Sequence, residues 1–204
     1  MRKNTLNAEQ GHGKTWEGFC KSLYYGGSDQ AAKLDAIFDV EKGIADDNLP
    51  VSIKSAKGGV IGLADACKHH AITEPYTILV GRYVQKGDWK EFYEVQKWTI
   101  TTAIHKKLWG DISATEVRKF HESLKEGSIS DARKAAKQHR KNLKQQGKPP
   151  IIALNPKINK DQRRLQCSIT IKRLTEIAGE PESFTDEYLG AGLPRYKSPK
   201  RSFQ

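Results

Sequence analysis

Two aspartates and a lysine have the types and the spacing that hydrolytic chemistry requires. Asp35 and Asp39 lie four positions apart in a segment where polar and apolar residues alternate. Ser52 and Lys54 lie two positions apart in a second such segment. Because side chains alternate between the faces of a strand, each pair shares a face. Carboxylate oxygens bind a hard cation and a lysine can position a water, which suits metal-assisted phosphodiester hydrolysis. The alternative is an amphipathic hairpin with solvated charges.

The periodicity of the sequence predicts the elements that would position these residues. The aspartates fall in a strand at 33–40, and the lysine falls in a strand at 50–55 after an acidic turn at 46–48. A helix at 7–25 precedes both. The apolar patterns that follow predict a helix at 62–71, strands at 76–84 and 89–95, helices at 100–109, 114–126 and 130–146, and strands at 151–157 and 163–171.

The composition narrows the class of protein. No apolar run approaches membrane-spanning length, and the N-terminus lacks the apolar region of a signal peptide. The three cysteines are scattered and form no CxxC pair, which argues against a disulfide framework and a cysteine zinc site. The sequence also lacks a phosphate-binding loop, a dinucleotide fingerprint and a His-Glu-x-x-His helix. We therefore expect a soluble, cytoplasmic protein with no membrane partner and no evident protein partner.

The net charge of +11 lies entirely in the second half of the chain. Residues 1–100 contain 13 basic and 13 acidic side chains, whereas residues 101–204 contain 22 basic and 11 acidic ones. A basic half beside a neutral half favours a polyanion-binding surface attached to a catalytic or structural core. A protein that is merely basic is the alternative.

The strand at 163–171 contains the best candidates for reading bases. An arginine can bond guanine bidentately and a glutamine can do the same to adenine in the major groove, which admits a two-stranded ribbon. A charged edge strand that prevents aggregation is the alternative. The candidates for base contacts are Arg163, Arg164 and Gln166, with Arg82 and Gln85 as second choices, and Lys157 and Lys160 would meet backbone phosphates.

The helix at 130–146 has almost no apolar stripe and is strongly basic. Such a helix either lies along a phosphate backbone or is a solvated surface helix, and the sequence leaves both interpretations open. Its candidate phosphate contacts are Arg133, Lys137, Arg140 and Lys141.

An ordered set of strings resembles the type II restriction endonucleases of the PD-(D/E)xK nuclease superfamily. The resemblance covers most of the chain and lies in the order of the strings. They are Trp16-Glu17, Lys33-Leu34-Asp35, Pro50-Val51-Ser52-Ile53-Lys54, Leu63-Ala64-Asp65-Ala66, Ile78-Leu79-Val80-Gly81-Arg82-Tyr83 with Gln85, Asn155-Pro156-Lys157, and Gln162-Arg163-Arg164-Leu165-Gln166-Cys167-Ser168-Ile169.

The resemblance implies a fold and a division of the chain. The fold would be α/β, an α+β mixed sheet flanked by helices around a PD-(D/E)xK restriction-endonuclease-like core. One domain would span residues 1–204. Within it, residues 1–110 would form a catalytic core with an N-terminal helix, 111–179 a basic DNA-binding portion, and 180–204 an irregular tail.

The resemblance also implies the roles of the site residues. Such enzymes are site-specific deoxyribonucleases that cut double-stranded DNA with Mg²⁺, and a palindromic site would suit a homodimer. Lys54 matches the catalytic lysine, and Asp35, or else Asp39, matches the first acid. Glu17 matches a helical glutamate directed at the metal, and the main-chain carbonyl of Ile53 would complete the ligand set.

The chain departs from the family's pattern at Ser52, which stands where an acid is expected. A serine offers a neutral oxygen, so the site would contain one carboxylate fewer. Asp39 or Glu17 makes up the ligand set, or metal binding is weaker. The alternatives are a DNA-binding protein that does not cut and a structure-specific nuclease.

Overall fold

The computed structural model describes residues 8–25, 37–145, 149–183 and 193–197, which fold into two compact units. The first unit comprises residues 1–59, 76–99 and 180–204, and the second comprises 60–75 and 100–179. The chain is mixed α/β with a mixed sheet flanked by helices, as the sequence predicts. None of the described helices is long and apolar enough to cross a membrane.

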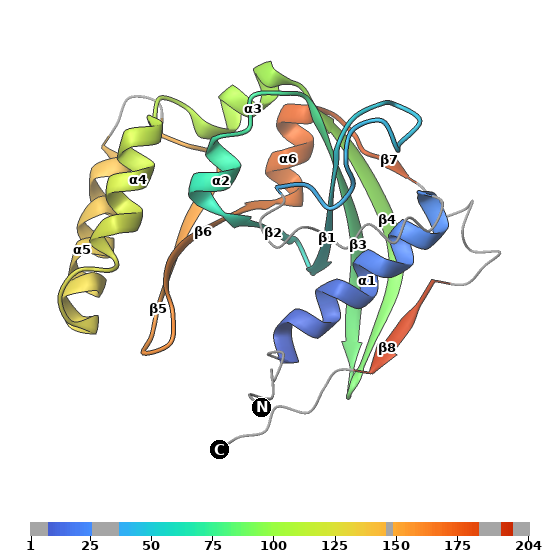
Figure 1. The fold of residues 1–204 in the computed structure, drawn as a ribbon, viewed down its shortest axis with the longest axis horizontal. Coiled ribbons are helices and arrows are strands. Elements are labelled where there is room, and N and C mark those ends of the chain that lie inside the picture. The colour runs from blue at the N-terminus through green and yellow to red at the C-terminus, as the bar shows by residue number, and fades with distance from the viewer. Residues whose placement is uncertain (1–7, 26–36, 146–148, 184–192, 198–204) are drawn as a thin grey trace. The chain divides into compact units, whose positions relative to one another are not determined.

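The sheet of the first unit is mixed, with strands in the order β1–β3–β4–β7 (Figure 1). β1 (Val51–Lys57) pairs in parallel with β3 (Tyr76–Lys86), and a two-residue turn joins β3 to its neighbour β4 (Trp89–Ile100). The segment 180–204, which the sequence predicts to be irregular, contributes two short strands, β7 (Glu182–Ser183) and β8 (Arg195–Lys197), both antiparallel to β4.

Trp16 is a central contact between the N-terminal helix and this sheet. Trp16 and Cys20 lie one turn apart on α1 (Ala8–Tyr24), and both are buried, as the helical periodicity predicts. The Trp16 indole stacks on Phe92 with ring centroids 4.2 Å apart and planes 8° from parallel. Gly81 of β3 lies against the same indole, where the absence of a side chain lets the ring approach the strand.

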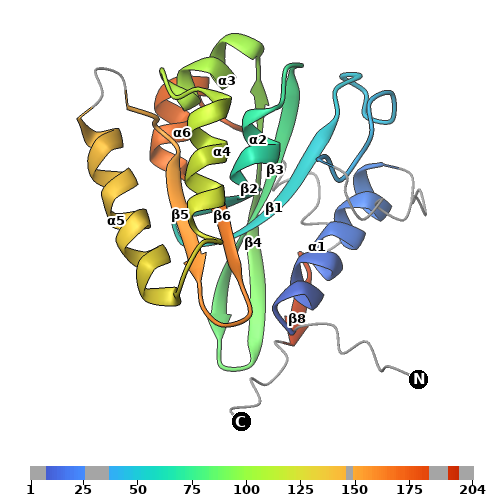
Figure 2. The ribbon, with the colours of Figure 1, turned by 60° about the vertical axis from the view of Figure 1, so that its left-hand side comes forward.

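The described residues of the second unit form a three-stranded antiparallel sheet and five helices. β6 (Arg163–Thr170) lies between β2 (Val60–Asp65) and β5 (Ala153–Ile158). Leu165, Cys167 and Ile169 alternate along β6 and are buried. Figure 2 shows α4 and α5 side by side near β5 and β6. The helices are α2 (Ala66–His70), α3 (Thr102–Trp109), α4 (Ala114–Ser123), α5 (Ile129–Lys144) and α6 (Ile171–Ala178).

Several predicted elements differ from those observed, and the strand predicted at 89–95 continues to Ile100. Residues 62–65 belong to β2 and not to a helix, because Ile61 and Leu63 are buried at alternate positions. The strand predicted at 33–40 lies partly outside the described residues, and its remainder forms bends and one isolated bridge from Val40 to Val51. The strand predicted at 163–171 ends at Thr170, whose side chain caps α6.

We predict that Gly81→Ala destabilises the protein by about 1–3 kcal/mol or more, because its new methyl group overlaps the Trp16 indole and lies 2.8 Å from Phe92 Cδ1. Gly18→Ala in α1 is the matched control, since no atom lies within 4 Å of its added methyl and alanine favours a helix by roughly 1 kcal/mol. The free energy of unfolding in urea checks both. Equal stabilities for the two variants would contradict the close approach.

Candidate functional site

The carboxylate of Asp39 and the ammonium of Lys54 meet at the outer edge of β1. Asp39 Oδ2 accepts a hydrogen bond from the main-chain N–H of Ile53 at 2.7 Å. The same oxygen lies 3.1 Å from Lys54 Nζ, which also donates to the Ile53 carbonyl oxygen at 3.1 Å. The two charged side chains are about one-fifth exposed, at 17% and 22%. The structure therefore brings together one predicted acid, the predicted lysine and the predicted main-chain ligand.

Main-chain hydrogen bonds between Asp39, Val40 and Val51 hold the aspartate in this place. The N–H groups of Asp39 and Val40 both donate to the Val51 carbonyl, at 2.9 and 3.0 Å, and Val51 N donates to the Val40 carbonyl at 2.9 Å. Two residues later on β1, the Ile53 N–H faces the same edge and meets the carboxylate. The edge of β1 is thus occupied by the segment that carries the acid.

The loop between Val40 and β1 is held by a second carboxylate, Asp47. Lys97 of β4 lies 3.0 Å from Asp47 Oδ2, and the same oxygen accepts from the Thr77 hydroxyl at 3.3 Å. The Leu49 N–H donates to Asp47 Oδ1 at 3.1 Å. Burial acts to raise the pKa of Asp47, but these hydrogen bonds and the Lys97 charge outweigh it and lower the pKa.

The N-terminal helix contacts the same stretch of β1. Trp16 Nε1 donates to the Lys54 carbonyl at 2.9 Å, so the catalytic lysine of the predicted site is fixed at its main chain. Glu17, the next residue of α1, forms an ion pair with Lys21 one turn later. Burial, and then the charges of Asp39 and Glu17, raise the pKa of the Cys20 thiol. Both carboxylates therefore lie near one buried thiol.

The other predicted residues of this site are placed as follows. Ser52 is 8% exposed and, two positions before Lys54 on β1, lies on the same face of the strand. Asp35, the preferred first acid, lies outside the described residues. Within the described residues no group of three or more His, Cys, Asp or Glu side chains could hold a metal ion.

The two oxygen atoms that contact Lys54 Nζ are of the types that bind a hard cation. A carboxylate oxygen and a main-chain carbonyl oxygen each lie 3.1 Å from the ammonium, and both are ligand types that Mg²⁺ accepts. The ammonium therefore lies where the two oxygens direct their negative charge. In the part of the chain that the structure describes, Asp39 and Ile53 could hold the ion with waters, and Glu17 is paired with Lys21.

The candidate base-reading residues of β6 separate into two groups. Arg163 Nη1 donates to three carbonyl oxygens after α4, those of Lys125, Glu126 and Gly127, at 3.1, 3.5 and 2.7 Å. This guanidinium fastens β6 to the α4–α5 connection. Arg164 is exposed and Gln166 half-buried, and both lie on the face opposite the buried Leu165.

The second-choice residues for base contacts are engaged within the first unit. Arg82 forms an ion pair with Glu94 and lies 5.2 Å from the centroid of the Tyr93 ring. The Gln85 side chain donates to the Gly87 carbonyl at 2.7 Å, within the β3–β4 turn. Both side chains support the β3–β4 pair.

The candidate phosphate contacts lie in the second unit. Lys157 is exposed and pairs with Arg164 across β5 and β6, and Lys160 lies in the turn that follows. Lys137 and Lys141 of α5 face a pocket beside β5, and Arg140 bridges to β5 through the Leu154 carbonyl at 3.3 Å. Two lysines of this pocket, Lys134 and Lys144, were not among the predicted contacts, although helical spacing places them on the Lys137 side.

Comparison with known proteins gives no match to a family model, to a curated protein or to a solved structure.

We predict that the Asp47 contacts stabilise the fold at neutral pH and not in acid. A folded-state pKa below the unfolded value gives stability that is present above about pH 4 and is lost as the pH falls through the folded pKa. Asp47→Asn should lower the free energy of unfolding at pH 7 by about 0.5–1 kcal/mol, given solvent screening, and by less near pH 3. Urea denaturation at both pH values measures this. Asp46→Asn is the matched control, and a pH-independent deficit in Asp47→Asn would contradict the assignment.

Proposed function

We propose that this protein is a Mg²⁺-dependent endonuclease that hydrolyses phosphodiester bonds in double-stranded DNA at specific sequences, as a type II restriction enzyme does. The observation that carries the proposal is the convergence of Asp39 Oδ2 and the Ile53 carbonyl on Lys54 Nζ. A PD-(D/E)xK site requires an acid close to a lysine, and Asp39, in the bend before the Val40 bridge, and Lys54 of β1 would supply these two groups. The basic second half of the chain supports a polyanionic substrate.

The residues of the site divide the chemistry between them. Mg²⁺, when bound, would lower the pKa of a coordinated water and neutralise charge that develops on the phosphate oxygens. Asp39 and the Ile53 carbonyl would hold the ion. The flexible four-carbon side chain of Lys54 would let its ammonium turn away from these oxygens. The ammonium would then contact the attacking water and orient it. The Trp16 hydrogen bond keeps the Lys54 main chain fixed while the side chain moves.

A second candidate function is sequence-specific DNA binding without cutting. Ser52 replaces the second acid, and Asp39 is the one carboxylate of the described residues that contacts Lys54. A lone carboxylate can be satisfied without a metal ion, here by the Lys54 ammonium and the Ile53 N–H. The same basic surface would then serve a binding protein.

Cleavage of plasmid DNA with Mg²⁺ separates these functions. We expect discrete fragments from the wild-type protein and no cutting by Lys54→Ala, whose DNA affinity in EDTA should stay within a few-fold of wild type. Lys57→Ala, an exposed lysine of the same strand, is the matched control and should cut normally. Intact but shifted plasmid with the wild-type protein would favour the binding function, and a fully active Lys54→Ala would overturn the site.

The same variant gives a readout that does not require cutting. Removing the ammonium leaves Asp39 Oδ2 and the Ile53 carbonyl without their cation, so Lys54→Ala should bind Mg²⁺ or Ca²⁺ at least as tightly as wild type, whereas Asp39→Asn should bind either ion more weakly. Isothermal titration calorimetry measures both. Unchanged affinity in Asp39→Asn would remove this aspartate from the ligand set.

We predict that replacing the two adjacent arginines of β6 affects different properties: DNA binding for Arg164 and stability for Arg163. Arg164→Ala should cost about 1–3 kcal/mol in binding the cognate site and relax the preference at one base pair, without changing the stability. Arg163→Ala should instead lower the stability, because three carbonyl oxygens lose their donor. Binding to a library of sites and urea denaturation check the pair. A uniform loss of affinity in Arg164→Ala would make this residue a phosphate contact.

A further inference from the structure

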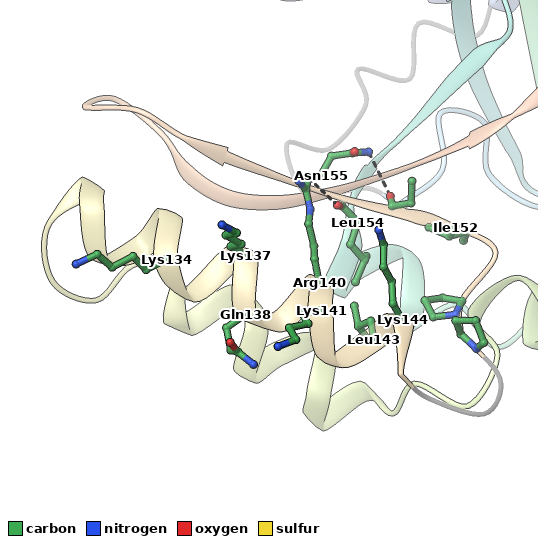
Figure 3. Close-up of a pocket in the computed structure, with 13 residues that line it drawn as sticks. Lys134, Lys137, Gln138, Arg140, Lys141, Leu143, Lys144, Ile152, Leu154 and Asn155 are labelled. Atoms are coloured by element: carbon green, nitrogen blue, oxygen red, sulfur yellow. Dashed lines mark hydrogen bonds between the residues drawn. The ribbon is translucent and has the colours of Figure 1, made fainter.

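We propose that the groove between α5 and β5 binds the phosphodiester backbone of a nucleic-acid strand, independently of its sequence. This α5–β5 groove has a volume of about 1020 Å³ and lies wholly within the second unit. Figure 3 shows its lining, in which Lys137, Arg140 and Lys144 extend from α5 toward β5. Five of the lining residues are cationic and none is acidic: Lys134, Lys137, Arg140, Lys141 and Lys144.

The lysines form a regular stripe along α5. They recur at i, i+3, i+7 and i+10, which is the spacing of one helix face. Ten residues of helix rise about 15 Å. One strand of a duplex carries a charge about every 3.4 Å along its axis, so a strand that ran along this stripe would present about four phosphates to it. The stripe is too long for a single phosphate group.

Three of these lysines, Lys137, Lys141 and Lys144, have no acid beside them on the helix. Lys134 lies near Asp131, whose pKa is lowered by hydrogen bonds from Ser128 and then by the charge of Lys134. Lys137 and Lys141 are one turn apart, a spacing at which like charges destabilise an isolated helix by about 0.2–0.5 kcal/mol. The single acid of α5, Asp131, accepts hydrogen bonds from Ser128 in the capping box. Among the described residues, no carboxylate forms an ion pair with the four lysines of the stripe. A polyanion would supply the missing negative charge.

Packing contacts fix the helix beside β5. Ala132 and Ala136 are buried on the face of α5 that contacts the unit, and His139 stacks on Phe120 of α4 at 4.6 Å. Arg140 donates to the Leu154 carbonyl of β5 at 3.3 Å. Ala132, Ala136 and His139 lie on the side of the helix roughly opposite the lysine stripe, so these contacts leave the lysines available while the groove keeps its shape.

The opposite wall determines which part of a nucleic acid the groove contacts. It is formed by prolines and small or aliphatic side chains, with Asn155 at one end: Pro149, Pro150, Ile152, Ala153 and Leu154. The described lining includes no aromatic ring on which a base could stack. The cationic wall would therefore hold phosphates and the neutral wall would face sugars, which gives affinity without sequence preference. This role deepens the proposed function and rests on it for the choice of DNA as substrate.

A salt titration of DNA binding tests the groove without requiring catalysis. Lys137, Lys141 and Lys144 are changed together to Gln, which keeps the helix propensity, and Arg140 is left intact because it bonds β5. Binding of a fluorescent non-cognate duplex is measured in EDTA from 50 to 300 mM salt. We expect the slope of log K against log salt to fall in magnitude by about 2.7, since each lost phosphate contact removes about 0.9, and the affinity at 0.1 M salt to fall by about 10²-fold or more.

The matched control replaces Lys107, Lys119 and Lys125, three exposed lysines of the same unit outside this groove, with Gln. The control should keep most of the wild-type slope, and urea denaturation should show both triple variants folded. An equal loss of slope in both variants would overturn the groove in favour of a diffuse basic surface. Inorganic phosphate is added as a competitor, and its concentration is compared with that of DNA counted per phosphate group. If free phosphate displaced the duplex as effectively as DNA phosphates do, the groove would be a small-anion site and the proposal would be overturned. A protein that binds DNA through the groove but never cuts would refute the endonuclease and leave this inference standing.

Discussion

The hydrogen bond from the Ile53 N–H to Asp39 Oδ2 is the contact on which the candidate site depends. A strand edge presents unpaired N–H groups, and here one of them is satisfied by a carboxylate whose negative charge also holds Lys54. The acid and the lysine are 15 residues apart and approach each other because the Val40–Val51 bridge turns the chain back along β1. One local constraint, the pairing of an edge, thus creates the arrangement on which hydrolytic chemistry would rely.

The α1 helix also helps to hold the site, because its Trp16 contacts the main chain of β1 at Lys54. Trp16 uses both properties of its ring: the apolar face stacks on Phe92 above Gly81, and the N–H bonds the Lys54 carbonyl. A side chain at position 81 would displace the ring, and with it the hydrogen bond to the strand. The position of the lysine main chain therefore depends on a glycine that lies in another strand and makes no contact with the lysine side chain.

The sequence predicts the strongly periodic elements of this fold, and it places the site less well. β3 and α4 follow from their apolar patterns, whereas spacing alone permits either Asp35 or Asp39 as the partner of Lys54. The resemblance favours Asp35, which lies outside the described residues. A one-residue bridge such as Val40–Val51 leaves no periodic signal. The sequence contains a signal against Arg163 as a base contact. Arg163 alternates in step with Leu165, Cys167 and Ile169, which places it on the buried face of β6. The spacing of the α5 lysines at i, i+3, i+7 and i+10 likewise predicts from the sequence that they share one face of the helix.

The described ion pairs are distributed differently in the two units of the chain. In the first unit, cations beside the sheet have carboxylate partners, as in Lys54–Asp39, Lys97–Asp47 and Arg82–Glu94. Each pair satisfies a local contact, and its field cancels within a few ångströms. The lysines of α5 have no such partners among the described residues, so their fields add along the helix. The proposed polyanion site needs a row of cations without carboxylate partners. Lys137, Lys141 and Lys144 of α5 provide such a row, whereas Lys54 is paired with Asp39.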